Sequence, residues 1–524
     1  MKRALLVCPF LFAAAYLAQE SRDATLSVRT LDAGTGRPTA VRVHLEDSQG
    51  NRPRVRGAVA ISDSAIPIPK QAVAVMWGQN DRAQGYALQP DGSFYVDGGF
   101  DLRVPAGAYR LTVSKGFEYV EQTLSLDLAP GANVTREVKL GRWIDMPSRG
   151  WYSSDDHIHL RRSPGDDPNI LTWIAAEDVH VGNILEMGDF WATYFSQYAF
   201  GERGRYQRDG RVLSAGQEEP RTPEIGHTIS LGAREFVRMQ PNYYSYDRLF
   251  DRVHELGGVS GFAHQGYLFH AYRGMVLNTL RGKTDFLELA QFCAPEGPLP
   301  AKYYYHFLDL GYRLTALAGS DFPWCGKGVA QIGNARFYTY TGEPALNYDS
   351  WFAAMKAGHT FVTTGPMLLL RVNGHLPGDT VDIAPGTKLR ITAEALGQGL
   401  KSLEIVGHGK SLAQAPGQGE SRLAAEVEIT PDRGLWIAAR CEGGRFQSAH
   451  TTPVYVTVNG GGFQNPATVA ANLQLSEEWL RELEHDLASP PPNLDIQAPR
   501  HRAALEGQIA EARAKLKSIA ETSR

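Results

Sequence analysis

The chain has 524 residues, which suggests about three or four domains of ordinary size. Its composition, 43% hydrophobic and 21% charged, is that of a soluble globular protein and excludes a disordered chain, a collagen and a protein with many membrane spans. The formal net charge is -4, so no excess of basic residues is present to bind DNA or RNA, and we expect a small-molecule substrate instead.

The first 18 residues are typical of a secretory signal peptide. Lys2 and Arg3 form a basic start, and the apolar run from Ala4 to Leu17 is too short for an ordinary membrane span. We therefore expect an exported protein, periplasmic or secreted, with no integral membrane segment after cleavage. The alternative is a short N-terminal element buried in the fold.

Cysteine usage predicts neither a disulfide framework nor thiolate-bound zinc. After the leader the chain keeps Cys293, Cys325 and Cys441, which are too few for such a framework and form no C-x-x-C motif. The sequence leaves open whether Cys293 pairs with Cys325.

Three segments with different patterns follow the leader. Residues 24–142 alternate apolar and polar residues in short runs separated by turn signals, which predicts a small N-terminal β-sandwich. In residues 143–365, strand-like runs such as Val181–Leu185 alternate with helix-like runs such as Ser245–Leu256. That rhythm favours βα units and a parallel sheet, open or closed into a barrel. Residues 366–460 return to short strands and predict a second β-sandwich.

Residues 461–524 predict a helical hairpin that docks on the rest of the chain. Apolar residues recur at helical spacing on both sides of the run Pro490-Pro491-Pro492, and Ser476 is the expected N-cap of the first helix. The two apolar faces consist of Leu475, Trp479, Leu480, Leu483 and Leu487, and of Leu505, Ile509, Leu516 and Ile519.

The strongest chemical signal is the run D-D-H-I-H-L-R-R-S-P-G-D, from Asp155 to Asp166. On a strand, His157 and His159 project to the same side because side chains alternate with a period of two. Two imidazoles a few ångströms apart make half of a metal site, and Asp166 follows at a spacing suited to an oxygen ligand. An H-x-H pair alone also occurs among ordinary surface histidines, so the appended Ser163 and Asp166 strengthen the metal interpretation.

Several apolar runs in the same segment carry an ionisable residue at or near their ends. The carboxyl ends of parallel strands are where such folds build active sites. Each of these residues alone is more often an ordinary loop residue, but their recurrence indicates a site. The candidates are Glu186 in N-I-L-E-M-G-D, Glu218 in G-Q-E-E, His227 in I-G-H-T, His264 in G-F-A-H and Asp321 in A-G-S-D.

In this order, the motifs resemble those of the PHP (polymerase and histidinol phosphatase) metallohydrolase superfamily. The shared pattern is H-x-H-x-x-x-S-x-x-D followed by G-x-E, G-H, A-H and G-S-D. The sequence is most similar to the CehA/McbA, or carbaryl-hydrolase-like, branch over roughly residues 100–380. The matching pieces are G-W-Y-S-S-D-D-H-I-H (150–159), G-H-T-I-S-L-G (226–232), A-G-S-D-F-P (318–323) and A-G-H-T-F-V-T-T-G-P (357–366).

This resemblance implies a multidomain α/β plus all-β chain, in which a distorted (β/α)7 barrel carries divalent metal at its C-terminal rim. It implies hydrolysis of amide, carbamate or ester bonds in this branch, and of phosphoesters elsewhere in the superfamily. For the site, it implies that His157 and His159 share one ion, which Asp321 completes unless it acts as the acid/base. It also implies that Glu218 bridges two ions if two are bound, and that His264 holds the second.

Two departures from the superfamily pattern remove ligands. The T-D-H after the second strand is here Leu185-Glu186-Met187, and the final D-x-H is Asp321-Phe322-Pro323. Glu186 is the best substitute for the first missing histidine. We therefore expect one or two ions, and the mixed histidine and carboxylate donors suit zinc, manganese or iron. Metal-activated water would be the nucleophile, with Asp321 and His227 as candidate proton carriers.

Two aromatic segments are candidates for substrate contacts. If the run D-F-W-A-T-Y-F-S-Q-Y-A-F covers the metal, Phe190, Trp191 and Tyr194 line an apolar pocket that favours an uncharged or aromatic substrate. Q-G-Y-L-F-H offers Tyr267 and His270 in the same way. Plain loop packing and helix capping are the alternatives.

Three functions therefore stay open. The first is an exported metal-dependent hydrolase of amide, carbamate or ester bonds. Arg161 and Arg162 are basic residues near the motifs and keep a phosphoesterase as the second. The missing histidines support the third, a non-catalytic secreted binding protein with a degenerate barrel site.

Overall fold

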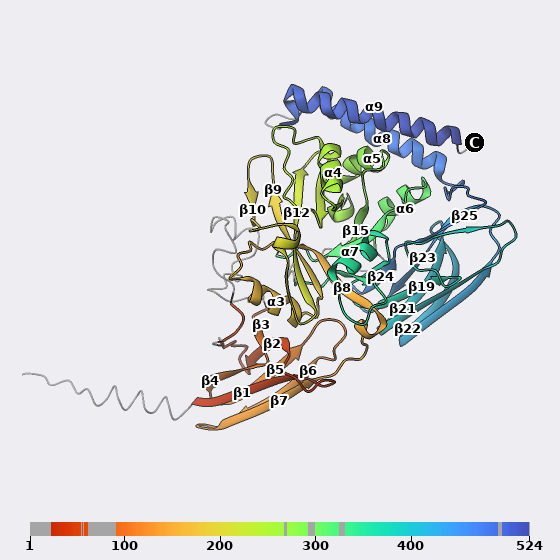
Figure 1. Ribbon diagram of the computed structural model, residues 1–524. Coiled ribbons are helices and arrows are strands. Elements are labelled where there is room, and N and C mark those ends of the chain that lie inside the picture. Colours follow the sequence, from red (N-terminus) through yellow and green to blue (C-terminus); the bar gives the residue numbers. More distant parts are fainter. Residues whose placement is uncertain are drawn as a thin grey trace, which may run out of the picture. The chain divides into compact units, whose positions relative to one another are not determined.

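The computed structural model describes residues 23–53, 55, 57–60, 91–266, 270–291, 299–323, 331–490 and 495–522. The expected signal peptide, Cys293, Cys325 and Tyr267 lie outside these residues, so the expectations about them stay predictions. Contacts divide the chain into two compact units (Figure 1). The first unit holds the described residues up to Asp145 together with Pro168–Asp178, and the second holds Met146–Asp167 and the described residues from Val179 onward.

The first unit contains two small sheets that share one apolar core. Every second residue of its first strand is buried, including Leu26 and Val28, which confirms the alternation predicted for this segment. One sheet consists of β4 (Gly99–Pro105), β1 (Asp23–Asp32) and β7 (Asn133–Leu140), and the other of β3 (Phe94–Asp97), β2 (Ala40–Asp47), β5 (Gly107–Ser114) and β6 (Gln122–Leu128). All pairings are antiparallel except that of β1 with β7.

A helix from further along the chain, α3 (Asp167–Ala176), contributes most of its length to this unit. The Lys115 ammonium donates to the carbonyl of Ala175 at 2.6 Å, and the Tyr95 hydroxyl donates to the Glu177 carboxylate at 2.6 Å. The first unit is therefore completed by residues that follow the H-x-H segment in the sequence.

The second unit is organised around one large mixed sheet system with helices packed beside it (Figure 1). Its central strands are buried at almost every position, as expected of strands covered on both faces. The strands are β8 (Trp151–Ile158), β9 (Val181–Gly188), β10 (Thr193–Tyr194), β11 (Tyr206–Arg208), β12 (Arg211–Thr222), β13 (Gly226–Leu231), β14 (Val259–Phe262), β15 (Phe286–Gln291), β16 (Thr315–Gly319) and β17 (Arg336–Tyr340). The helices between them are α4 (Tyr246–Glu255), α5 (Ala271–Thr279), α6 (Lys302–Asp309) and α7 (Tyr348–Lys356).

The pairing of these strands confirms part of the expected parallel sheet and corrects the rest. β8 with β9, β9 with β12, β14 with β15, and β15 with β16 are parallel. β13 is antiparallel to both β12 and β14. The reason is local: the chain reverses between Thr222 and Gly226 without a helix, so β12 and β13 form a hairpin rather than a βα unit.

The segment predicted as a second sandwich is hydrogen-bonded into the same sheet system, because β18 pairs with both β17 and β24. Its longest strands, β21 and β22, form one antiparallel hairpin. The strands are β18 (Thr360–Thr363), β19 (Met367–Val372), β20 (Thr380–Ile383), β21 (Leu389–Gly407), β22 (Lys410–Ile429), β23 (Leu435–Glu442), β24 (Ser448–Thr451) and β25 (Val454–Val458).

Two long helices, α8 (Val469–Ala488) and α9 (Pro499–Thr522), follow the sheet and pack against each other and against α5, which confirms the helical tail (Figure 1). The predicted apolar faces are buried, with Leu475 and Ile519 partly so. Ser476 is not an N-cap, because α8 begins at Val469, about two turns before it. The Ser476 hydroxyl lies 2.9 Å from His306 Nε2 of α6. No helix among the described residues is long and apolar enough to cross a membrane.

Candidate metal centre

The two histidines of the H-x-H pair lie on one side of the chain at the end of β8. The Nε2 atoms of His157 and His159 are 3.1 Å apart, which confirms the placement predicted from the strand period. The Asp155 carboxylate fixes this end of the strand by accepting three backbone N–H groups. They belong to His157 (3.0 Å), Ser320 (2.9 Å) and Gly333 (2.7 Å).

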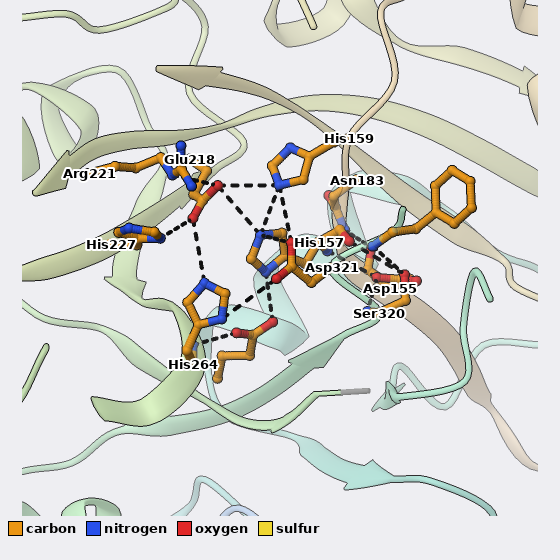
Figure 2. A network of polar contacts seen from close by, with 12 residues as sticks. Asp155, His157, His159, Asn183, Glu218, Arg221, His227, His264, Ser320 and Asp321 are labelled. Carbon is orange, nitrogen blue, oxygen red and sulfur yellow. Dashed lines mark hydrogen bonds and ion pairs between the residues drawn. The ribbon is translucent and has the colours of Figure 1, made fainter. Parts of the chain in front are cut away.

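Asp321 joins the two histidines from the segment that follows β16. Its Oδ1 atom is 3.2 Å from His157 Nε2 and 3.4 Å from His159 Nε2. Two ligand atoms bound to zinc at ordinary lengths in a tetrahedral site are about 3.3 Å apart. The three donor atoms therefore form one buried group that could hold a metal ion (Figure 2).

Glu218, on β12, connects this group to a second one. Its Oε2 atom lies 3.2 Å from His159 Nε2 and 3.8 Å from His157 Nε2. Its Oε1 atom lies 2.8 Å from His227 Nδ1 and 3.6 Å from His264 Nε2. His157, Glu218 and His264 form the second buried group that could hold a metal ion. A carboxylate with one oxygen beside each group is placed to bridge two ions.

Glu288, in the middle of β15, orients two of these histidines. Its Oε1 atom accepts a hydrogen bond from His157 Nδ1 at 3.0 Å, and its Oε2 atom accepts the backbone N–H of His264 at 2.6 Å. A histidine that donates one ring N–H to a carboxylate presents its other nitrogen as a ligand. Glu288 was not among the residues predicted from the sequence; the available signal was a single acidic residue inside the apolar run F-L-E-L-A.

The surroundings of Glu218 and Asp321 favour their ionised forms, which metal ligands need. Burial alone would raise the pKa of Glu218, but the charge of Arg221 and the imidazoles beside the carboxylate outweigh it and hold that pKa well below its ordinary value. Burial also opposes ionisation of Asp321, and His157 outweighs it to lower that pKa. Glu218 Oε1 is buried yet accepts no hydrogen bond of good geometry from the described residues. An ionised, buried oxygen of this kind fits a divalent cation.

Two predicted ligands lie outside the cluster and have local partners instead. The Asp166 carboxylate accepts the Ser163 hydroxyl at 2.6 Å. The Glu186 carboxylate, at the end of β9, accepts the backbone N–H of Gln197 at 3.0 Å, and burial raises its pKa. Neither residue belongs to a described group that could hold a metal ion, so their ligand roles stay predictions.

The residues predicted to contact the substrate differ in their burial and in their partners. Phe190 packs against Tyr243, Trp191 is 79% exposed, and Tyr194 donates to Asp189 at 3.2 Å. His270 is exposed and lies 3.0 Å from the Tyr272 hydroxyl.

The aromatic residue that reaches the cluster is Phe195, from the same aromatic run. Its ring is fully buried and stacks on the His159 ring at 5.4 Å between centroids. The aromatic run itself was the signal for this contact, but it does not say which ring turns inward.

Comparisons with known proteins assign no family. No protein-family profile and no curated protein matches the chain. Among solved structures, the chain is similar to two crystal structures of the N-terminal four Ig domains of Dscam1, isoforms 8.4 and 9.44. Each is 10% identical, with a TM-score of 0.13, and the match covers 82% of this chain and 96% of the other. A TM-score this low carries no argument about fold or function.

Proposed function

We propose that the protein is an exported, divalent-metal-dependent hydrolase of an amide, carbamate or ester bond, with a PHP-like barrel of the CehA/McbA type around its site. The observation that carries this proposal is the triangle of His157 Nε2, His159 Nε2 and Asp321 Oδ1, with sides of 3.1, 3.2 and 3.4 Å. The same motifs that resemble the superfamily supply all three residues, and Glu218 and His264 as well.

The ligand roles follow from which atoms face each other. His157, His159 and Asp321 would hold one ion, and Glu218 would share its carboxylate between that ion and a second one at His264. A divalent ion bound there supplies a water of lowered pKa and polarises the substrate oxygen. Zinc, manganese and iron suit this set of donors.

Asp321 and His227 are the candidates for moving the proton. Burial first, and the charge of Arg221 next, lower the pKa of His227 to about 3, so its imidazole is neutral. The Nδ1 atom of His227 lies 2.8 Å from Glu218 Oε1, a hydrogen-bond distance, and His227 belongs to neither described group that could hold a metal ion. If Asp321 holds the first ion through Oδ1, which faces the two histidines, its Oδ2 atom or the His227 imidazole would take a proton from the attacking water and return it to the leaving group.

Metal analysis of the full-length protein tests the proposal. We expect about one or two divalent ions per chain, and we expect His157→Ala to lose both the metal and the hydrolysis of naphthyl carbamates and acetates. His254→Ala is a matched control, because His254 pairs with Asp285 at 2.7 Å and lies outside the cluster. A metal content near zero in the wild type would contradict the proposal, as would an unchanged content in His157→Ala.

The same preparations separate the other candidate functions. Arg162, which kept a phosphoesterase open, is buried and donates to Asp167 at 2.8 Å and to the Gly204 carbonyl at 3.0 Å, so it does not offer its charge to a substrate. Turnover confined to p-nitrophenyl phosphate would nevertheless establish the phosphoesterase. Bound metal without turnover of any of these compounds would favour the non-catalytic binding protein.

A further inference from the structure

Arg221 is the charged side chain at the cluster that the proposed ligand set does not use. Its Nε atom lies 3.0 Å from Glu218 Oε2, and Figure 2 shows the two side chains together. Within the described part of the chain, no other lysine or arginine forms an ion pair with Glu218, Asp321 or Glu288. Arg221 is therefore the basic group that a ligand at this site would meet.

An irregularity in β12 brings Arg221 to the side of the strand that carries Glu218. In a regular strand, residues three apart point to opposite faces. Here Glu218 lies opposite Ile229 and Arg221 lies opposite His227, so β12 has one extra residue between the two pairs. Such a bulge re-aims the side chain that follows it. The extra residue in β12 is thus the reason that the Arg221 side chain lies on the same side of the strand as Glu218.

The charged side chains of the cluster differ in how far solvent reaches them. The side chains of His157 and Glu288 are 0% exposed and that of Glu218 is 1% exposed, whereas those of Asp321 and Arg221 are 9% and 22% exposed. Arg221 is therefore the charged side chain of the cluster that solvent reaches most readily.

We propose that Arg221 binds a carboxylate carried by the substrate, close to the bond that is cleaved. This inference rests on the proposed hydrolase function and names the substrate class: amides or esters of acids that keep one free carboxylate. A guanidinium presents parallel N–H donors that match the two oxygens of a carboxylate, and the atom of Arg221 nearest Glu218 is Nε.

The shape of the Arg221 donor group matches a carboxylate, and the titrations below compare a carboxylate with a phosphate. This proposal differs from the expectation of an uncharged or aromatic substrate that the aromatic run gave.

The first test compares two esters that differ by one carboxylate, naphthyl acetate and naphthyl hemisuccinate, in the full-length metal-loaded protein. We expect kcat/KM to favour the hemisuccinate by tenfold or more in the wild type, and this preference to disappear in Arg221→Gln and to weaken in Arg221→Lys. The ratio of the two substrates is measured on one preparation, so loss of metal affects both equally. Arg161→Gln, which removes an exposed arginine outside the cluster, is the matched control and should keep the ratio.

The second test measures binding without turnover, by calorimetric titration with succinate and with inorganic phosphate. We expect succinate affinity to fall at least tenfold in Arg221→Gln, with metal content and unfolding midpoint recorded for each variant. If neither ester is hydrolysed but succinate binding depends on Arg221, the hydrolase function fails while this assignment stands. An ester preference and a succinate affinity that are the same in both Arg221 variants as in the wild type would overturn the assignment, as would tighter binding of phosphate than of succinate.

Discussion

The substitution Glu288→Gln removes one charge from beside the metal cluster and leaves the size of the side chain unchanged. The carboxylate accepts two hydrogen bonds, from His157 Nδ1 at 3.0 Å and from the His264 backbone at 2.6 Å. Hydrogen bonds to a charged group contribute about 1.5–3 kcal/mol each, and an amide can accept one of these two because its nitrogen is itself a donor. We therefore expect the free energy of unfolding to fall by about 2–4 kcal/mol. Metal affinity should fall by about 10- to 100-fold, because His157 loses the carboxylate that orients it.

Two measurements separate these effects. Urea unfolding of the metal-free protein gives the stability change, and competition with a chelator of known affinity gives the change in metal binding. Glu177→Gln is the matched control, because Glu177 is an equally buried carboxylate of the first unit that accepts the Tyr95 hydroxyl at 2.6 Å. It should lose stability and keep the metal affinity. An unchanged metal affinity in Glu288→Gln, or an equal loss in Glu177→Gln, would refute the role assigned to Glu288.

Three other predictions concern packing and pH. Gly319→Ala should abolish metal binding, because an added Cβ would lie 2.3 Å from Asp156 Oδ1 and 2.4 Å from His157 Cβ; a variant that still binds metal as tightly as the wild type would contradict this. Leu480→Ala, at a fully buried position of α8, should lower the free energy of unfolding in urea by about 2–5 kcal/mol, and a loss below about 1 kcal/mol would show that the tail is not docked as described. Burial lowers the pKa of His306 from 6.5 to about 3. Between these two pH values His306 is protonated in the unfolded chain and neutral in the folded chain. The free energy of unfolding should therefore fall by about 1.4 kcal/mol for each unit by which the pH drops below 6.5. Urea unfolding at several pH values should show a slope that is smaller in His306→Gln than in the wild type by about this amount, because His227, whose pKa is also lowered to about 3, contributes in both proteins; equal slopes would rule out His306 as a contributor.

Features that depend on a local repeat could be predicted from the sequence. The two-residue period of a strand placed His157 and His159 together, and the helical period located the buried faces of α8 and α9, including Leu480. The chain order of the motifs also indicated Asp321, which lies within 3.4 Å of both histidines.

Features that depend on contacts between distant segments, or on local backbone irregularities, could not be predicted from the sequence. Glu288 meets His157 across 131 residues of sequence, and no local pattern sets that contact. The direction of Arg221 depends on a one-residue irregularity in β12, and the inward turn of Phe195 accompanies a left-handed backbone at φ 56°. Asp166 has the spacing of a ligand and its carboxylate accepts the Ser163 hydroxyl, so its ligand role stays a prediction.

The donors of the cluster come from separate strands or the segments that follow them, and this dispersal would couple the proposed metal binding to folding of the whole second unit. His157 lies in β8, Glu218 lies in β12, and Asp321 lies just after the end of β16. No short segment of the unfolded chain therefore contains these three donors together. An ion that binds the folded chain alone adds its binding free energy to the stability of the entire unit rather than to one loop. The melting temperature should therefore rise with free metal concentration. A chelator that removes the ion should lower the stability of the whole second unit.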